Sequence, residues 1–206
     1  MSVSLAQLEK DLERALDIGD QDMVASVRTT IGDQHPKTDA GAEANYKLGL
    51  QSLFVHRNAE HAVDRLREAA KAKSATWTPS ARVALAMVLF RQGKAQQSLF
   101  ELRKVSGVKP STLSSAQAMG FMVIIHRDLN QPDEAARVRE DQLKTLTLLT
   151  KDEHLETAAM ANYMLGMEYK FDGQRKEAAA CLRSALEVST WPEDDRSRIQ
   201  AALDSL

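Results

Sequence analysis

The chain has 206 residues, of which 43% are hydrophobic and 27% are charged, and its formal net charge is −2 at pH 7. These proportions are ordinary for a soluble protein, and the weak negative charge points neither to nucleic acid nor to an anionic membrane. With only 9 glycines and 5 prolines, the sequence disfavours a loop-rich or all-β chain and favours helices instead.

Two amphipathic helices are predicted at the start of the chain. The first carries leucines on one side, at Leu5, Leu8, Leu12 and Leu16. The second carries apolar residues at Met23, Val24, Val27 and Ile31. The polar segment that follows, Gly32–Gly41, is expected to be the longest loop of the chain. It would separate an N-terminal helical hairpin, residues 1–33, from the rest.

Eight further helices are predicted in four consecutive pairs, each pair joined by a short polar turn. Their expected bounds are Ala42–Val55 with Ala59–Lys73, Pro79–Arg91 with Ala95–Val105, Ser111–Asp128 with Asp133–Thr150, and Glu153–Phe171 with Arg175–Val188. Turns such as "RQGK" and "FDGQ" typically join antiparallel helices. A last helix, residues 193–206, follows Pro192 and begins with acidic residues, which suit the free amides of a helix N-terminus.

The predicted pairs share a residue pattern at a constant spacing. In the last pair it reads Asn162-x2-Leu165-Gly166-x2-Tyr169, followed by Gly173, Ala178, Leu182 and Ala185. The second pair repeats it as Arg82-x2-Leu85-Ala86-x2-Leu89, and the first pair retains Leu48-Gly49. The third pair is a weaker copy, with Met122-Val123 in place of the Leu-Gly dipeptide.

This pattern resembles the tetratricopeptide repeat family, with about four repeats between residues 42 and 192 in an expected repeat array over residues 34–192. The resemblance implies an all-α fold, a right-handed superhelical solenoid of antiparallel helix pairs, capped by the N-terminal hairpin and the helix 193–206. The tryptophan usual in the family is replaced, at Asn45, Arg82, Met119 and Asn162. The third copy also departs from the family in having Arg139 at a usually apolar position and a longer second helix.

Small residues in this pattern are expected where two helices cross closely. In the first helices they are Gly49, Ala86 and Gly166, and in the second helices they are Ala62, Ser98, Ala135 and Ala178. Glycine inside a helix costs about 1 kcal/mol relative to alanine, so a gain in packing must offset that cost.

The resemblance also implies which side chains face the concave surface, where partners of this family usually bind. They are Tyr46, Leu50, Phe54, Val83, Met87, Phe90, Phe121, Ile124, Arg127, Tyr163, Met167 and Lys170. A mostly apolar groove with flexible methionines suits an apolar or amphipathic segment of a partner protein. The alternative is that these residues belong to the core and are covered by neighbouring helices or by the apolar ends of the chain.

Candidate catalytic and metal-binding constellations are weak. The five histidines are scattered, and the spacing of His56 and His61 across a turn is not that of a helical metal pair. The single cysteine, Cys181, excludes an internal disulfide and fits a reducing compartment. No G-x-S-x-G, phosphate-loop or H-E-x-x-H motif occurs. We therefore expect that the protein is not an enzyme and that it binds neither a metal ion nor a cofactor.

These features favour a cytoplasmic protein–protein interaction module, a scaffold or adaptor that binds a protein or peptide partner. One alternative is a cytoplasmic chaperone that holds an apolar secretion substrate. Another is self-association, because exposed apolar faces on terminal helices can form homodimers. We expect no nucleic-acid partner and no membrane insertion, since the longest apolar run, Phe121–Ile125, is far shorter than the roughly 20 residues of a span.

Overall fold

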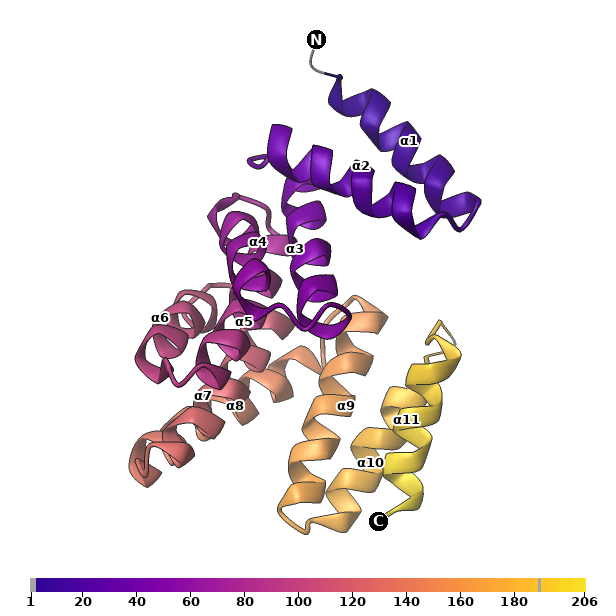
Figure 1. The fold of residues 1–206 in the computed structure, drawn as a ribbon. Helices are drawn as coiled ribbons and strands as arrows, with labels where there is room; N and C mark the ends of the chain where they lie inside the picture. The colour runs from indigo at the N-terminus through magenta and orange to yellow at the C-terminus, as the bar shows by residue number, and fades with distance from the viewer. Residues whose placement is uncertain (1–2, 189) are drawn as a thin grey trace. The chain divides into compact units, whose positions relative to one another are not determined.

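The computed structural model describes residues 3–188 and 190–206, and this part of the chain contains eleven helices and no strand (Figure 1). The predicted all-α class is confirmed. The helices are α1 (Leu5–Asp17), α2 (Gln21–Gln34), α3 (Asp39–Phe54), α4 (Ala59–Lys71), α5 (Trp77–Arg91), α6 (Ala95–Ser106), α7 (Leu113–Asp128), α8 (Pro132–Leu149), α9 (Leu155–Phe171), α10 (Arg175–Leu186) and α11 (Glu193–Asp204). They divide into two compact units, Met1–Val105 and Ser106–Leu206.

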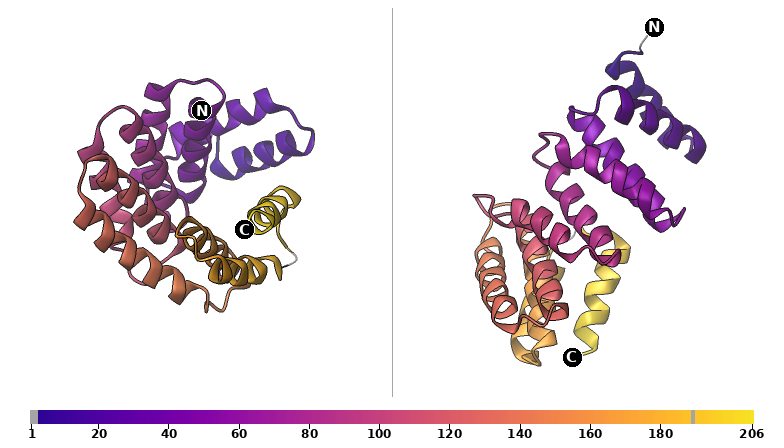
Figure 2. Two further views of the ribbon diagram at one scale, coloured as in Figure 1. Left: turned by 90° about the horizontal axis from the view of Figure 1, so that it is seen from below. Right: turned by 60° about the vertical axis from the view of Figure 1, so that its left-hand side comes forward.

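In the first unit, consecutive helices pack as antiparallel hairpins around small apolar clusters (Figures 1 and 2). Leu8, Ile31 and Ala44 join α1, α2 and α3 in one cluster. A second cluster joins α4 to α5 through residues that include Leu66 and Val88. Because each hairpin buries its apolar side against the next, the core extends along the row of helices.

The second unit contains the pairs α7/α8 and α9/α10, followed by α11 (Figures 1 and 2). Ala116, Leu146 and Leu165 belong to the cluster that joins α7, α8 and α9. The last helix packs on α10, where Ile199 meets Leu182. Just before α11 the Trp191 indole Nε1 donates a hydrogen bond of 2.7 Å to the Ala185 carbonyl. The α11 helix therefore covers the apolar outer side of α10.

The connection between α2 and α3 is shorter than the sequence predicts. A loop over Gly32–Gly41 was expected, but α2 continues to Gln34 and α3 begins at Asp39, so the prediction is wrong in its extent. The Thr38 hydroxyl accepts a hydrogen bond from the Gly41 amide at 3.1 Å and thereby caps α3. A Cβ atom on Gly41 would lie 1.9 Å from the His35 carbonyl oxygen, so the tight connection requires glycine at this position.

Small residues lie where the two helices of a pair cross. A Cβ atom added at Gly49 would lie 2.7 Å from Leu66 Cγ, and one at Gly166 would lie 2.9 Å from Leu182 Cγ. In the pair α5/α6, the Ser98 hydroxyl donates to the Ala86 carbonyl at 2.7 Å. The remaining residues of the predicted set, Ala62, Ala135 and Ala178, are buried. Each crossing therefore brings one helix against the backbone or the smallest side chains of the other.

In the third pair, the small residue of the first helix lies one turn earlier than in the other pairs. Its α7 helix carries Gly120, where an added Cβ would lie 2.9 Å from the Gln142 amide nitrogen of α8. The long second helix that the sequence predicts for this pair is confirmed, because α8 has 18 residues whereas α6 and α10 have 12 each. The extra turn of α8 supplies Leu146 and Leu149 to the core beside α9.

Candidate functional site

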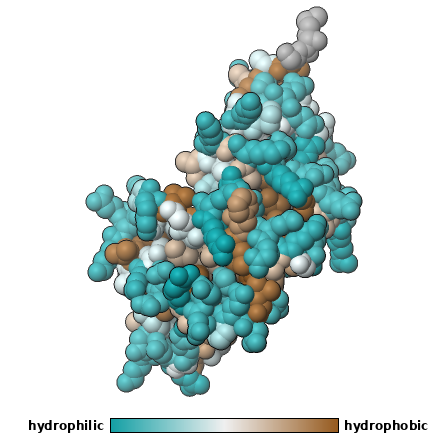
Figure 3. Space-filling view, turned by 90° about the vertical axis from the view of Figure 1, so that its left-hand side faces the viewer, coloured by the Kyte–Doolittle hydropathy of each residue, from teal (hydrophilic) through white to brown (hydrophobic). Residues whose placement is uncertain are grey.

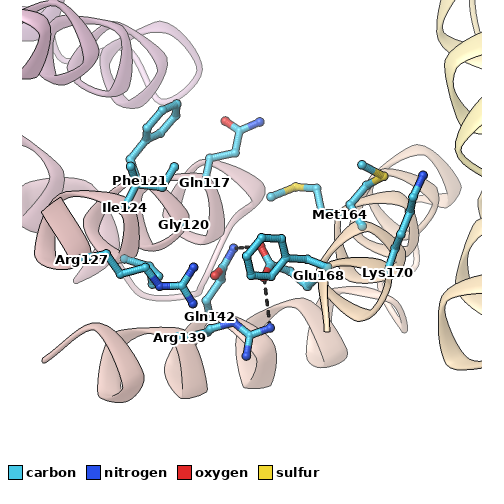
Figure 4. Close-up of a pocket in the computed structure, with 13 residues that line it drawn as sticks. Gln117, Gly120, Phe121, Ile124, Arg127, Arg139, Gln142, Met164, Glu168 and Lys170 are labelled. Carbon is cyan, nitrogen blue, oxygen red and sulfur yellow. Dashed lines mark hydrogen bonds and ion pairs between the residues drawn. The ribbon is translucent and has the colours of Figure 1, made fainter. Parts of the chain in front are cut away.

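A groove of about 590 Å³ opens in the second unit between α7, α8 and α9 (Figure 4). We call it the apolar groove. Its lining residues are Gln117, Gly120, Phe121, Val123, Ile124 and Arg127 of α7, Arg139 and Gln142 of α8, and Met164, Met167, Glu168, Lys170 and Phe171 of α9. Its volume is in the range of sites that hold small molecules or several side chains of a partner.

The walls of the apolar groove are hydrophobic side chains that water reaches. Ile124 is 52% exposed and Phe171 is 72% exposed. Phe121 of α7 and Met164 of α9 also line the groove (Figure 4). Figure 3 shows hydrophobic patches between hydrophilic side chains on one face of the molecule. Contiguous apolar surface of this kind commonly marks an interaction site, because covering it removes hydrocarbon from water.

A network of polar groups forms the floor of the groove. The Arg139 guanidinium contacts the Glu168 carboxylate at 3.4 Å, and the Gln142 amide donates to Glu168 at 3.3 Å (Figure 4). Arg139 also contacts the Asp172 carboxylate at 2.6 Å. The hydrogen bond from Arg139 to Asp172, aided by the charges of both carboxylates, raises the pKa of Arg139 despite its partial burial. The Glu168 carboxylate is thus held in place and its charge is compensated.

Two cations lie toward the ends of the α7 and α9 helices. The Arg127 guanidinium lies 5.4 Å from the centre of the Phe171 ring, a cation–π contact across the groove. The Lys170 ammonium donates to the Ala202 carbonyl at 3.3 Å and to the Ser205 hydroxyl, both at the end of α11. Because the C-terminal end of a helix attracts positive charge, Lys170 ties α11 to α9.

The structure places five of the six predicted groove residues of the second unit around the apolar groove: Phe121, Ile124, Arg127, Met167 and Lys170. Tyr163 lies elsewhere, beside the cluster that α10 forms with α11. Sequence reasoning missed Met164, Gln142 and Glu168. A signal was present, since Met164, Met167, Glu168 and Phe171 follow each other at steps of three, one and three residues along one face of α9.

The predicted residues of the first unit are mostly packed. Tyr46 lies beside Trp77, with ring centres 5.5 Å apart, and burial raises the pKa of its phenol. Leu50 packs against the α4/α5 cluster, and Val83 is buried. Met87 and Phe90 are half-buried on α5. Phe54, at the end of α3, is exposed.

One close serine–histidine pair has the wrong surroundings for catalysis. The Ser52 hydroxyl lies 2.8 Å from His61 Nδ1, but Ser52 is buried and its hydroxyl also bonds the Leu48 carbonyl at 2.8 Å. A serine so enclosed cannot reach a substrate carbonyl. Burial also raises the pKa of the Cys181 thiol, which packs against the α7–α9 cluster.

The described residues contain neither a clustered metal site nor a membrane-spanning helix. Within residues 3–188 and 190–206, no group of three or more His, Cys, Asp or Glu side chains is placed to hold a metal ion. In the same part of the chain, no helix combines the length and hydropathy needed to cross a bilayer.

The charged contacts of the groove floor lead to a prediction about stability. Arg139→Ala is expected to lower the free energy of unfolding by about 1 kcal/mol, because it leaves the carboxylates of Glu168 and Asp172 close together without their cation. The control Arg137→Ala removes only an exposed ion pair with Glu134 and should change the free energy by less than about 0.5 kcal/mol. Urea unfolding followed by circular dichroism measures both, and equal effects would contradict a structural role for Arg139.

Comparisons with known proteins bear on the fold. Residues 159–190, which cover most of α9 and all of α10, match the tetratricopeptide repeat family. None of the curated protein sequences matches the chain. Among solved structures, the fold is similar to that of MamA, with a TM-score of 0.51, 16% identity, and coverage of 98% of this chain and 99% of the other.

A second similar structure is that of kinesin light chain TPR-like repeats from Podosopora anserina. It has a TM-score of 0.50 and 14% identity, and the match covers 96% of this chain and 95% of the other. At such identities the similarity establishes the fold and not the binding partner. The segment that matches the family contains most of the helix pair α9/α10, and this pair crosses closely at Gly166. Residues 159–190 are a tetratricopeptide repeat, and the chain has the fold of proteins built from such repeats.

Proposed function

We propose that this protein is a protein–protein interaction module that binds an apolar or amphipathic segment of a partner in the apolar groove. The observation that supports this function most directly is the set of exposed hydrophobic side chains on facing helices, Ile124 on α7 and Met167 and Phe171 on α9. Covering hydrocarbon stabilises a complex by roughly 25 cal/mol for each Å² removed from water. Methionines at 164 and 167 can adjust to different partner shapes.

The charges around the groove select among apolar segments. Arg139 is already compensated by Glu168 and Asp172, and Lys170 is held by the end of α11. Arg127 contacts the Phe171 ring but forms no ion pair within residues 3–188 and 190–206. A partner segment with an acidic residue beside its apolar side chains would therefore pair with Arg127 and gain orientation. A scaffold or adaptor role in the cytoplasm is the corresponding cellular role that we propose.

Site-specific photo-crosslinking tests this function. The photoreactive residue p-benzoylphenylalanine is placed at Phe171 in one variant and at Leu148 in a control, and the protein is irradiated in a lysate of its native cells. Both side chains are strongly exposed, but Leu148 lies outside the apolar groove. We expect the variant at position 171 to cross-link one apolar or amphipathic segment that the control does not reach. Identical cross-links at both positions, or none at 171, would contradict the proposal.

Self-association is a second candidate, because Leu16 and Ile18 at the end of α1 are exposed apolar residues on the first helix of the chain. Light scattering over a concentration series separates the two functions. A mass that rises to twice that of one chain would favour a homodimer. A constant mass of one chain would leave the partner-binding module as the function.

A further inference from the structure

A second, smaller groove lies in the first unit and is lined by residues of α1, α2 and α3. Its volume is about 270 Å³. The floor is apolar, with Ile31 and Ala44 buried beneath it and Leu12 half-buried at its side. Leu16 forms its outer edge and is 50% exposed. A space of this size accommodates about two aliphatic side chains.

The groove arises because the leucine row of α1 is longer than the surface that covers it. Leu8 is buried against Ile31 and Ala44. Leu16 lies on the same side of α1, two turns later, and remains exposed because nothing in the described first unit packs over it. An amphipathic helix therefore presents the second half of its apolar stripe to water.

Carboxylates flank this stripe along its length. Glu9, Glu13 and Asp17 follow each other every four residues, so they form one row on α1 with steps of about 6 Å. All three are exposed, and none of them forms an ion pair within residues 3–188 and 190–206. They therefore produce a local negative field beside the exposed leucines.

The other charged groups that face the groove leave this field in place. On α3, Glu43 is paired with Lys47 at 2.6 Å. On α2, burial lowers the pKa of Arg28, and the charge of Glu43 opposes that shift. Arg28 and Lys47 together carry two positive charges against the one negative charge of Glu43, so these groups add a single positive charge beside the three carboxylates on α1, and the net charge along the groove stays negative. We call the surface formed by Leu12, Leu16 and this row the acidic groove.

We propose that the acidic groove is a second docking surface that binds a basic amphipathic helix of a partner protein. Two apolar side chains one turn apart would enter the space beside Leu12 and Leu16. Lysine or arginine residues at four-residue spacing would face Glu9, Glu13 and Asp17, since two helices laid side by side match this repeat. The acidic groove and the apolar groove thus select segments of opposite charge.

The test measures binding of a labelled synthetic helical peptide with leucines on one face and lysines on the other. Fluorescence anisotropy is recorded for the full chain and for the triple variant Glu9→Gln, Glu13→Gln, Asp17→Asn. We expect the variant to weaken binding by about tenfold or more, and the difference to shrink as salt is raised. In methyl spectra of the wild-type chain, the peptide should shift the resonances of Leu12 and Leu16.

The chain offers a matched control on α4. Glu60, Asp64 and Glu68 have the same four-residue spacing but no apolar groove beside them. The triple variant Glu60→Gln, Asp64→Asn, Glu68→Gln removes the same charge and should bind the peptide as the wild type does. Equal losses in the two triple variants would reduce the effect to net charge and overturn the proposal.

Two further outcomes are decisive. Binding of the basic peptide should be unchanged in Met167→Asp, which disrupts only the apolar groove, so the two proposals fail or stand separately. Light scattering of the chain without peptide should detect no oligomer in the wild type that is absent from the α1 triple variant. Such an oligomer would mean that a second copy occupies the acidic groove, and the proposed partner helix would be wrong.

Discussion

Replacing Ile124 and Met167 together by aspartate is expected to weaken binding of the partner segment at least about a hundredfold, or roughly 3 kcal/mol. Both side chains line the apolar groove from facing helices, so a partner seated there would bury both new carboxylates. Burying an ionised group without a counter-charge costs several kcal/mol. Isothermal titration calorimetry with a peptide of the cross-linked segment measures the loss.

The fold should survive this double substitution, because Ile124 and Met167 are partly exposed and a carboxylate at either position is hydrated in the free protein. The control Leu148→Asp changes a more exposed apolar residue on α8, outside the groove. It should bind the peptide with the wild-type affinity. If the double variant also binds as the wild type does, while its circular dichroism is unchanged, the apolar groove is not the binding site.

Gly166→Val is expected to lower the free energy of unfolding by about 2–3 kcal/mol. A Cβ atom at this position would lie 2.9 Å from Leu182 Cγ and 3.3 Å from the Ala178 carbonyl oxygen. Leu182 is fully buried and already packs against Ile199 of α11, so it cannot move aside without disturbing the outer helix. Valine therefore forces α9 and α10 apart at their crossing.

The control for this prediction is Ala136→Val on α8, an exposed helical position. Ala136→Val lowers helix propensity by about 0.6 kcal/mol through branching at Cβ and makes no steric contact, whereas replacing glycine by valine does not lower helix propensity. Urea unfolding of both variants by circular dichroism gives the comparison. A loss at Gly166 no larger than the loss at Ala136 would show that the close crossing is not a source of stability.

Much of this architecture could be predicted from local patterns. Apolar residues at helical spacing predicted the helices, and the Leu-Gly and Ala-rich motif of Asn162–Leu186 predicted the pair that matches the tetratricopeptide repeat family. These signals depend on residues three or four positions apart, and the helix imposes that geometry wherever it forms. The Gly32–Gly41 prediction failed because a polar segment was taken as a loop, whereas Gly32 and Gly41 lie in helices, where the absence of a side chain permits close packing.

Polar residues at the family's tryptophan position illustrate what local patterns cannot supply. Asn45 is fully buried, donates to the Gly32 carbonyl at 3.1 Å and accepts from Arg65 of α4. Arg82 donates to the Ala70 carbonyl at 2.7 Å and pairs with Glu101. Polar contacts within a pair and between neighbouring pairs thus take the place of the packing of a large ring, and the sequence shows the substitution without its partners.

The sequence by itself determined the helical class, the pairing of consecutive helices and the small residues at the crossings of every pair except α7/α8, because all three follow from the periodicity of one helix and its immediate neighbour. Only the tertiary structure decided which surfaces remain open. Arg139 meets Asp172 across 33 positions of sequence, and Tyr163 packs toward α11 while Met164 lines the groove. Such outcomes depend on the rotation and crossing of helices from different pairs, which small differences in side-chain volume control.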